Sequence, residues 1–248
     1  MAALEDALCE HAGLTAAMLI EPLVMGAGGM KMYPPSYLAK VRELTARYGV
    51  HLIADEVAVG FGRTGTMFAC EQANVTPDFL CLSKGITNGM LPFAATLVTD
   101  EVYAAFYDDY ENGKTFFHGH TFTANPLGCA VALASLDLFE NEGTLAFAKR
   151  SAEVLAEESK KLYRHEAVGD VRTTGHIAAF ELVDDRATKQ PYSRKPRVGK
   201  MLYERGLAEG LILRPLGHVM YLFLPLCVTS DQTREIITRM DRVFEDVL

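Results

Sequence analysis

Four short apolar runs, separated by segments with helical patterning, constrain the fold of this chain more than any other feature. The runs span residues 15–24, 51–57, 78–85 and 93–100. The clearest helical segment between them covers residues 36–49, with Gly49 as its expected stop. Apolar runs that alternate with helices are typical of a largely parallel sheet covered on both faces. We therefore predict the α/β class.

The pattern changes after a long helical segment that Asn125 and Pro126 open. From about residue 145 the sequence predicts a smaller α/β domain, so the chain divides into residues 1–144 and 145–248. The second part should contain a helix, a strand, a polar loop, a helix, two strands and a closing helix, at residues 145–163, 171–183, 184–197, 198–210, 211–217, 218–226 and 230–248. Ser230 or Asp231 is the expected N-cap of the closing helix.

Composition limits the class of protein. The 248 residues carry a formal net charge of −8, which argues against a nucleic-acid surface. Five cysteines form no CxxC pair, so we expect neither a disulfide framework nor a zinc site, and a reducing compartment such as the cytoplasm is the simplest inference. We expect no secretory signal and no membrane span, because no apolar stretch is long enough.

Two charged residues, Asp55 and Lys84, each end an apolar run. A lysine desolvated at the end of a buried strand loses its proton more easily and can form a Schiff base, although the same position suits a lysine whose amine reaches water. An acid at a strand end can pair with the protonated ring nitrogen of pyridoxal phosphate (PLP), or can be an ordinary loop acid. Their 29-residue spacing fits a strand–loop–helix–strand unit that brings both to one sheet edge.

Three further patterns carry possible chemistry. Gly119, His120 and Thr121 precede a helix, a place that suits a bound phosphate but also fits an ordinary capped loop. Arg214 lies between two apolar segments, where it could clamp a substrate carboxylate or form a structural ion pair. The GxGxxG match at residues 60–65 is not expected to bind a dinucleotide, because the next strand does not end in an acid.

Taken together, these segments resemble the class III aminotransferases of PLP fold type I. The resemblance is carried by residues 21–89 and extends over nearly the whole chain. Four segments are most similar to the biotin-biosynthetic members of that class: GAGGMKMY, GFGRTGTMFACE, PDFLCLSKG and HGHTFTANPLGCA. The resemblance implies a partial large domain with a mixed, mostly parallel sheet in residues 1–144, and a C-terminal small α/β domain in residues 145–248.

The resemblance also implies roles for single residues. Lys84 matches the Schiff-base lysine, and Asp55 matches the acid that faces the ring nitrogen of PLP. His120 and Thr121 match phosphate contacts that come from the neighbouring subunit of a homodimer. Gly119 and Arg214 match positions that contact the keto acceptor, with Arg214 on its carboxylate. The implied partners are therefore a second copy of the chain and two small molecules, an amino donor and an acceptor.

The chain departs from its relatives in three ways. Met25 stands where many relatives have Gln, and His120 where adenosylmethionine-using members often have Pro, so the donor could be S-adenosylmethionine or lysine. Whole members of the class begin well before residue 1, and the expected missing part carries a Gly-Ser phosphate cup and an aromatic that stacks on the ring. Two alternatives stay open: a broader ω-amino acid or diamine aminotransferase, and an inactive fragment that needs a partner chain.

Overall fold

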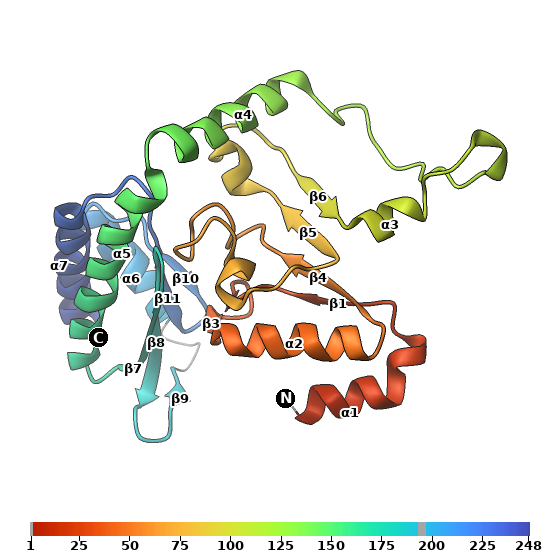
Figure 1. Ribbon diagram of the computed structural model, residues 1–248. Helices are drawn as coiled ribbons and strands as arrows, with labels where there is room; N and C mark the ends of the chain where they lie inside the picture. Colours follow the sequence, from red (N-terminus) through yellow and green to blue (C-terminus); the bar gives the residue numbers. More distant parts are fainter. Residues whose placement is uncertain (1, 193–196) are drawn as a thin grey trace. The chain divides into compact units, whose positions relative to one another are not determined.

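The computed structural model describes residues 2–192 and 197–248, and these fall into two compact units (Figure 1). Unit 1 consists of residues 2–23, 33–61 and 68–142. Unit 2 consists of residues 24–32, 62–67 and 143–248, without the undescribed 193–196. Both units combine helices with a sheet, so the predicted α/β class is confirmed.

Unit 1 is built on a four-stranded sheet in the order β1-β4-β5-β6. The strands are β1 (Ala17–Ile20), β4 (His51–Asp55), β5 (Phe79–Leu82) and β6 (Ala95–Val98). Three of them run parallel, while β6 is antiparallel to β5. The other elements of unit 1 are α1 (Ala2–His11), η1 (Ala12–Leu14), α2 (Pro35–Arg47), η2 (Ala69–Ala73), η3 (Lys84–Thr87), α3 (Asp100–Ala104), η4 (Tyr110–Asn112) and α4 (Pro126–Asn141). All four predicted runs thus form strands of one sheet.

Helix α2 covers one face of this sheet. It begins with Pro35 in its first turn, where the missing N–H costs nothing. Its buried residues Leu38 and Val41 pack with Leu52 and Ala54 of β4 in one apolar cluster. The helix ends just before Gly49, whose φ of +67° confirms the predicted stop.

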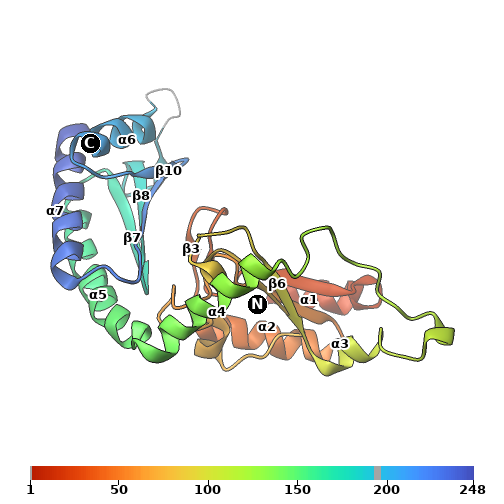
Figure 2. The same cartoon turned by 90° about the horizontal axis from the view of Figure 1, so that it is seen from above.

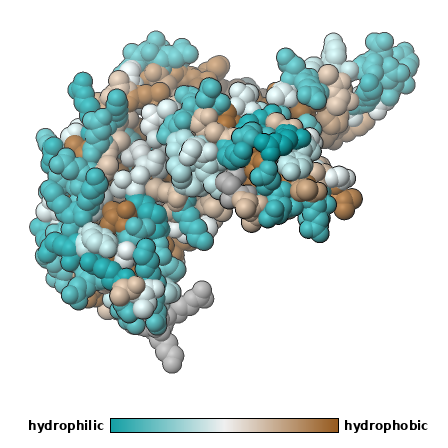
Figure 3. Space-filling view, turned by 60° about the horizontal axis from the view of Figure 1, so that its bottom comes forward, coloured by the Kyte–Doolittle hydropathy of each residue, from teal (hydrophilic) through white to brown (hydrophobic). Residues whose placement is uncertain are grey.

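The opposite face of the sheet is more open. The strand registers place Leu19, Ile53, Phe79 and Val98 in one row across the four strands. Leu19 is 62% exposed and Val98 is 41% exposed. Figure 3 shows hydrophobic residues, coloured brown, at several places on one side of the molecular surface. The prediction that helices cover both faces is therefore wrong for the described residues. The reason is that α4, the other long helix of unit 1, packs against η3.

Unit 2 is an antiparallel sheet with three helices on one face (Figure 2). Its main sheet has the order β10-β11-β8-β7. The elements are β2 (Val24–Met25), β3 (Lys31–Met32), α5 (Thr144–Ser159), η5 (Lys160–Arg164), β7 (Val168–Thr174), β8 (Ile177–Asp185), β9 (Gln190–Pro191), α6 (Val198–Ala208), β10 (Arg214–Leu216), β11 (Val219–Phe223) and α7 (Ser230–Val247). Apolar side chains of α5, α6 and α7, among them Leu155, Leu202 and Phe244, bury Phe180 and Met220 of the sheet.

Several local predictions for unit 2 were wrong. Residues 171–183 form a hairpin rather than one strand, because Gly175, with φ of +51°, turns the chain between β7 and β8. The N-cap of α7 is Thr229, whose hydroxyl accepts a hydrogen bond from the Gln232 N–H in a capping box. The loop predicted for residues 184–197 contains β9, and its residues 193–196 lie outside the described part.

Candidate functional site

The structure brings Asp55 and Lys84 to the same edge of the unit 1 sheet. Asp55 is the last residue of β4, and its Cα is registered opposite Cys81 of the parallel strand β5. Lys84 lies three residues beyond Cys81, at the start of η3. With strands about 4.8 Å apart and about 3.3 Å per residue, a straight continuation of β5 would put the two Cα atoms roughly 11 Å apart. The carboxyl ends of neighbouring parallel strands are where open α/β sheets bind ligands.

Lys84 is held in an unusual backbone conformation. Its φ is +44°, in the left-handed region that non-glycine residues visit at a cost of about 1–3 kcal/mol. Its carbonyl accepts a hydrogen bond from the Gly89 N–H at 3.1 Å. The side chain is exposed, so the predicted desolvation of this lysine is not found, because η3 carries it out of the strand. Within the described part of the chain, its amine forms no ion pair.

Asp55 and the next residue, Glu56, are fixed differently. The Oδ1 atom of Asp55 accepts a hydrogen bond from the Val57 N–H at 3.0 Å. Glu56 is completely buried, and its two carboxylate oxygens accept hydrogen bonds from the N–H groups of Ala69 at 2.7 Å and Cys70 at 2.8 Å. Burial raises the pKa of Glu56, while these backbone hydrogen bonds oppose the shift. Glu56 therefore anchors η2 to the end of the strand that carries Asp55.

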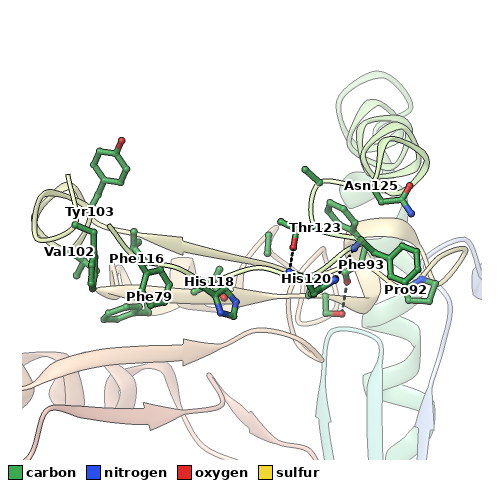
Figure 4. A pocket seen from close by; sticks show the side chains of 18 residues that line it. Phe79, Pro92, Phe93, Val102, Tyr103, Phe116, His118, His120, Thr123 and Asn125 are labelled. Carbon is green, nitrogen blue, oxygen red and sulfur yellow. Dashed lines mark hydrogen bonds between the residues drawn. The ribbon is translucent and has the colours of Figure 1, made fainter. Parts of the chain in front are cut away.

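A pocket of about 1320 Å³ lies beside β5 and β6 in unit 1 (Figure 4). Its walls include Ser83, the neighbour of Lys84, and Thr96, which is registered opposite Cys81. His120 also lines it, whereas the other predicted residues do not. Most of the remaining wall is aromatic or apolar: Phe79, Pro92, Phe93, Ala94, Ala95, Val98, Val102, Tyr103, Phe106, Phe116, Phe122 and Ala124.

The predicted phosphate segment is exposed in this chain. The His120 N–H donates to Thr123 Oγ1 at 2.8 Å, and His120 Nδ1 accepts from the Phe122 N–H at 3.1 Å. Both Gly119 and Thr121 are exposed, and a Cβ added at Gly119 would meet only Thr123 Oγ1, at 3.5 Å. Asn125 caps α4 as predicted, since its Oδ1 accepts from the Leu127 N–H at 2.9 Å. The segment is thus locally ordered by its own hydrogen bonds.

Arg214 begins β10 in unit 2, where it is exposed and registered opposite Tyr221. It forms no ion pair with any residue that the structure describes. The structural ion pair considered as an alternative is therefore not found, and the guanidinium is available for an anionic ligand.

In unit 2, a buried polar cluster connects the turn between β7 and β8 to residues 62–65, which have the sequence GRTG. His176 is 1% exposed, and its Nε2 lies 2.9 Å from Ser151 Oγ. Because the Ser151 hydroxyl donates to the Ala148 carbonyl, the His176 Nε2–H is the donor to Ser151. Burial, and to a lesser extent the charge of Arg63, lower the pKa of His176 to about 4. Arg63 itself lies over the Phe223 ring and donates to the Leu224 carbonyl, and burial lowers its pKa to about 10.

Other site types are not found among the described residues. No group of three His, Cys, Asp or Glu side chains there could hold a metal ion. No helix of residues 2–192 or 197–248 is long and apolar enough to cross a bilayer. The five cysteines are all free thiols.

Comparisons with known proteins give a consistent result. The family model for aminotransferase class III matches residues 2–244. The adenosylmethionine-8-amino-7-oxononanoate aminotransferase of Geobacter sulfurreducens is 52% identical over 98% of this chain and 54% of that protein. The protein of the same name from Methanocaldococcus jannaschii is 40% identical over 96% of this chain and 52% of its own length. The chain therefore spans about half the length of the curated relatives it matches.

Solved structures agree. The crystal structure of the M. jannaschii protein superposes with a TM-score of 0.94 at 37% identity, over 98% of this chain and 57% of that one. A PLP-bound amine transaminase from an uncultivated Pseudomonas species superposes with a TM-score of 0.92 at 34% identity, over 100% and 56%. A thermostable omega transaminase from Pseudomonas jessenii also reaches 0.92 at 34% identity, over 99% and 54%.

Proposed function

The chain belongs to the class III aminotransferases, with part of the type I fold of PLP-dependent transaminases, and from this premise we propose that it carries the cofactor lysine of a transaminase. The proposed reaction converts 8-amino-7-oxononanoate to 7,8-diaminononanoate in biotin synthesis, in the cytoplasm. The name shared by its relatives supports the substrate. The observation that carries the proposal is the convergence of Asp55 and Lys84 at one edge of adjacent parallel strands.

The residues at this edge fit PLP. A primary amine and a carboxylate on neighbouring strand ends can engage the aldehyde and the ring nitrogen of one pyridine ring. When bound, the cofactor supplies an electron sink for the carbon that loses or gains the amino group. Lys84 would hold the aldehyde carbon covalently and later move a proton as general base and acid. Asp55 would keep the ring nitrogen protonated through a charge-assisted hydrogen bond.

The remaining predicted residues have supporting roles in this proposal. His120 and Thr121 would reach the cofactor phosphate of a second subunit in a homodimer, which agrees with their exposure in the single chain. Arg214 would bind the carboxylate of the keto acceptor, and its lack of an ion pair among described residues supports that role. Gly119 would lie beside the acceptor. The donor is S-adenosylmethionine or lysine.

A broader ω-amino acid or diamine aminotransferase is the second candidate. The observation that favours it is the similarity to amine and omega transaminases, at TM-scores of 0.92. A panel of S-adenosylmethionine, lysine and simple diamines as donors, with 8-amino-7-oxononanoate and pyruvate as acceptors, separates the two candidates.

A requirement for a partner chain is the third candidate, and the open sheet face with the exposed Leu19 favours it. Titration of the purified 248-residue chain with PLP distinguishes this case. A chain that binds only after a supplied amino-terminal half of a relative is added needs a partner.

The central assignment is tested with Lys84→Ala and the matched surface variant Lys200→Ala. After incubation with PLP and reduction with borohydride, mass spectrometry should find the cofactor on Lys84 in the parent and in Lys200→Ala. Lys84→Ala should carry none and show no turnover. Cofactor fixed at another lysine in the parent would overturn the assignment.

A further inference from the structure

The aromatic side chain of Phe61 packs against the backbone next to Lys84. A Cβ added at Gly85 would lie 2.8 Å from Phe61 Cβ and 2.9 Å from Phe61 Cδ2, so the glycine Cα is already in contact with that side chain. Gly85 has an ordinary φ, so the need for glycine here is steric and not conformational. Phe61 is only 5% exposed.

Hydrogen bonds hold the same turn from the other side. The carbonyl of Gly85 accepts the Ser135 hydroxyl at 3.3 Å, and Ser135 Oγ accepts the side-chain amide of Asn88 at 2.9 Å. The Asn88 N–H also donates to the Gly85 carbonyl at 3.1 Å. Gly85 thus lies between the ring of Phe61 on one side and Ser135 of α4 on the other.

The position of Phe61 is itself well determined. Its φ is +54°, another left-handed non-glycine backbone, which persists only where neighbours enforce it. Its ring meets Phe68 edge to face, with centroids 5.6 Å apart. Phe68 directly precedes η2, and the buried Glu56 carboxylate ties η2 to the end of β4. A continuous set of contacts therefore runs from the residue after Asp55 to the residue after Lys84.

We propose that Phe61 is a positioning residue for Lys84: its ring, fixed by Phe68 and the Glu56 anchor, holds the strained Lys84–Gly85 backbone in the conformation from which the amine acts. Left-handed backbone at Lys84 is costly by itself, so removing this support lets the turn relax. The inference rests on the proposed function of Lys84, and it assigns Phe61 no contact with substrate or cofactor.

The test is a double-mutant cycle between Gly85→Ala and Phe61→Gly in the whole chain. The new methyl of Gly85→Ala collides with Phe61, whereas Phe61→Gly removes the atoms that it meets and accepts a positive φ without strain. The matched control is Gly206→Ala, which places a methyl 2.9 Å from Leu213 Cδ1 in unit 2. Gly206→Ala introduces a steric clash comparable to that of Gly85→Ala, but at a position distant in sequence from Lys84.

Two measurements report on the conformation of the turn at Lys84 and Gly85, and one of them needs no cofactor. Hydrogen exchange at the amides of Ile86, Asn88 and Gly89 should accelerate about tenfold in Gly85→Ala and stay unchanged in Gly206→Ala. The pH midpoint of the visible absorbance of Lys84-bound PLP should shift in Gly85→Ala and in Phe61→Gly, and should be unchanged in Gly206→Ala. In the Phe61→Gly background, adding Gly85→Ala should change exchange by less than about twofold.

Equal effects of Gly85→Ala with and without Phe61 would overturn the proposal, as would unchanged exchange in Gly85→Ala. If Phe61→Gly does not fold, Phe61→Ala replaces it in the same cycle; it removes Cγ and Cδ2 but keeps Cβ, so the same expectations hold at smaller amplitude. A parent chain that takes up no PLP at Lys84, either alone or with the amino-terminal half of a relative, would refute the proposed function, while the exchange cycle would still decide the role of Phe61.

Discussion

Replacing His176 by glutamine should remove a dependence of stability on pH that the buried cluster of unit 2 creates. Burial lowers the pKa of His176 from 6.5 to about 4 in the folded chain. Between these values the unfolded chain binds a proton that the folded chain does not bind. Acid therefore favours unfolding in this range, so the stability is complete above pH 6.5, falls towards pH 4 and is constant below it.

The size of the effect follows from the same shift. At about 1.4 kcal/mol per pKa unit, the interval from 6.5 to about 4 corresponds to roughly 3 kcal/mol, a large part of the stability of a small domain. His176 is 1% exposed, so solvent screening removes little of it. Glutamine keeps an N–H donor for Ser151 and does not titrate, which isolates the protonation from the hydrogen bond.

Urea unfolding followed by circular dichroism, at half-unit steps from pH 4 to pH 7.5, measures the difference between parent and His176→Gln. This difference should change by roughly 3 kcal/mol across the range, because all other titrations cancel. The control His11→Gln, at the exposed end of α1, should follow the parent curve. Parallel curves for parent and His176→Gln would refute the reasoning.

Two further predictions concern stability. Glu56→Gln turns one buried acceptor into a donor that faces a backbone N–H, so it should cost about 2–4 kcal/mol in urea unfolding at pH 7, whereas Glu10→Gln, at an exposed position of α1, should cost nothing measurable. A neutral Glu56→Gln would show that the two backbone hydrogen bonds are not made. Thr229→Ala removes the cap of α7 and should lower the free energy of unfolding by about 1 kcal/mol. The control Ser230→Ala should stay within about 0.5 kcal/mol of the parent. A larger loss in Ser230→Ala than in Thr229→Ala would show that Ser230 is the cap.

Much of unit 1 could be predicted from periodicity and spacing. The strands of residues 51–57 and 78–85 were recognisable because each is a short apolar run between turn signals, and their spacing placed Asp55 and Lys84 at one edge. The exposure of Lys84 could not be predicted, because burial of a strand end depends on which other segments pack over it. The hairpin at Gly175 was missed because two strands with the same two-residue period read as one when only a single glycine separates them.

The burial of Glu56 could have been predicted from the alternation of residues along the second apolar run. Leu52 and Ala54 of β4 and Glu56, the residue after the strand, occupy alternate positions, and all three are buried. A carboxylate in register with a buried apolar face must be hydrogen-bonded, and its donors could have been sought among the amides of the following loop. The partners themselves, Ala69 and Cys70, follow only from the three-dimensional path of that loop. Phe61 carried no signal, because nothing in its sequence surroundings indicates contact with a glycine 24 residues away.

The division of the chain into two units affects how it can be divided into fragments. Unit 2 includes the stretches 24–32 and 62–67 as well as everything after residue 142. Arg172 donates hydrogen bonds to the carbonyls of Gly29 and Met30, and Gly175 packs so closely on residue 63 that an added Cβ would collide with the Arg63 carbonyl. A recombinant piece starting at residue 143 would lose both sets of contacts, so a clean protease cut there should release a fragment with two unprotected patches instead of an autonomous domain.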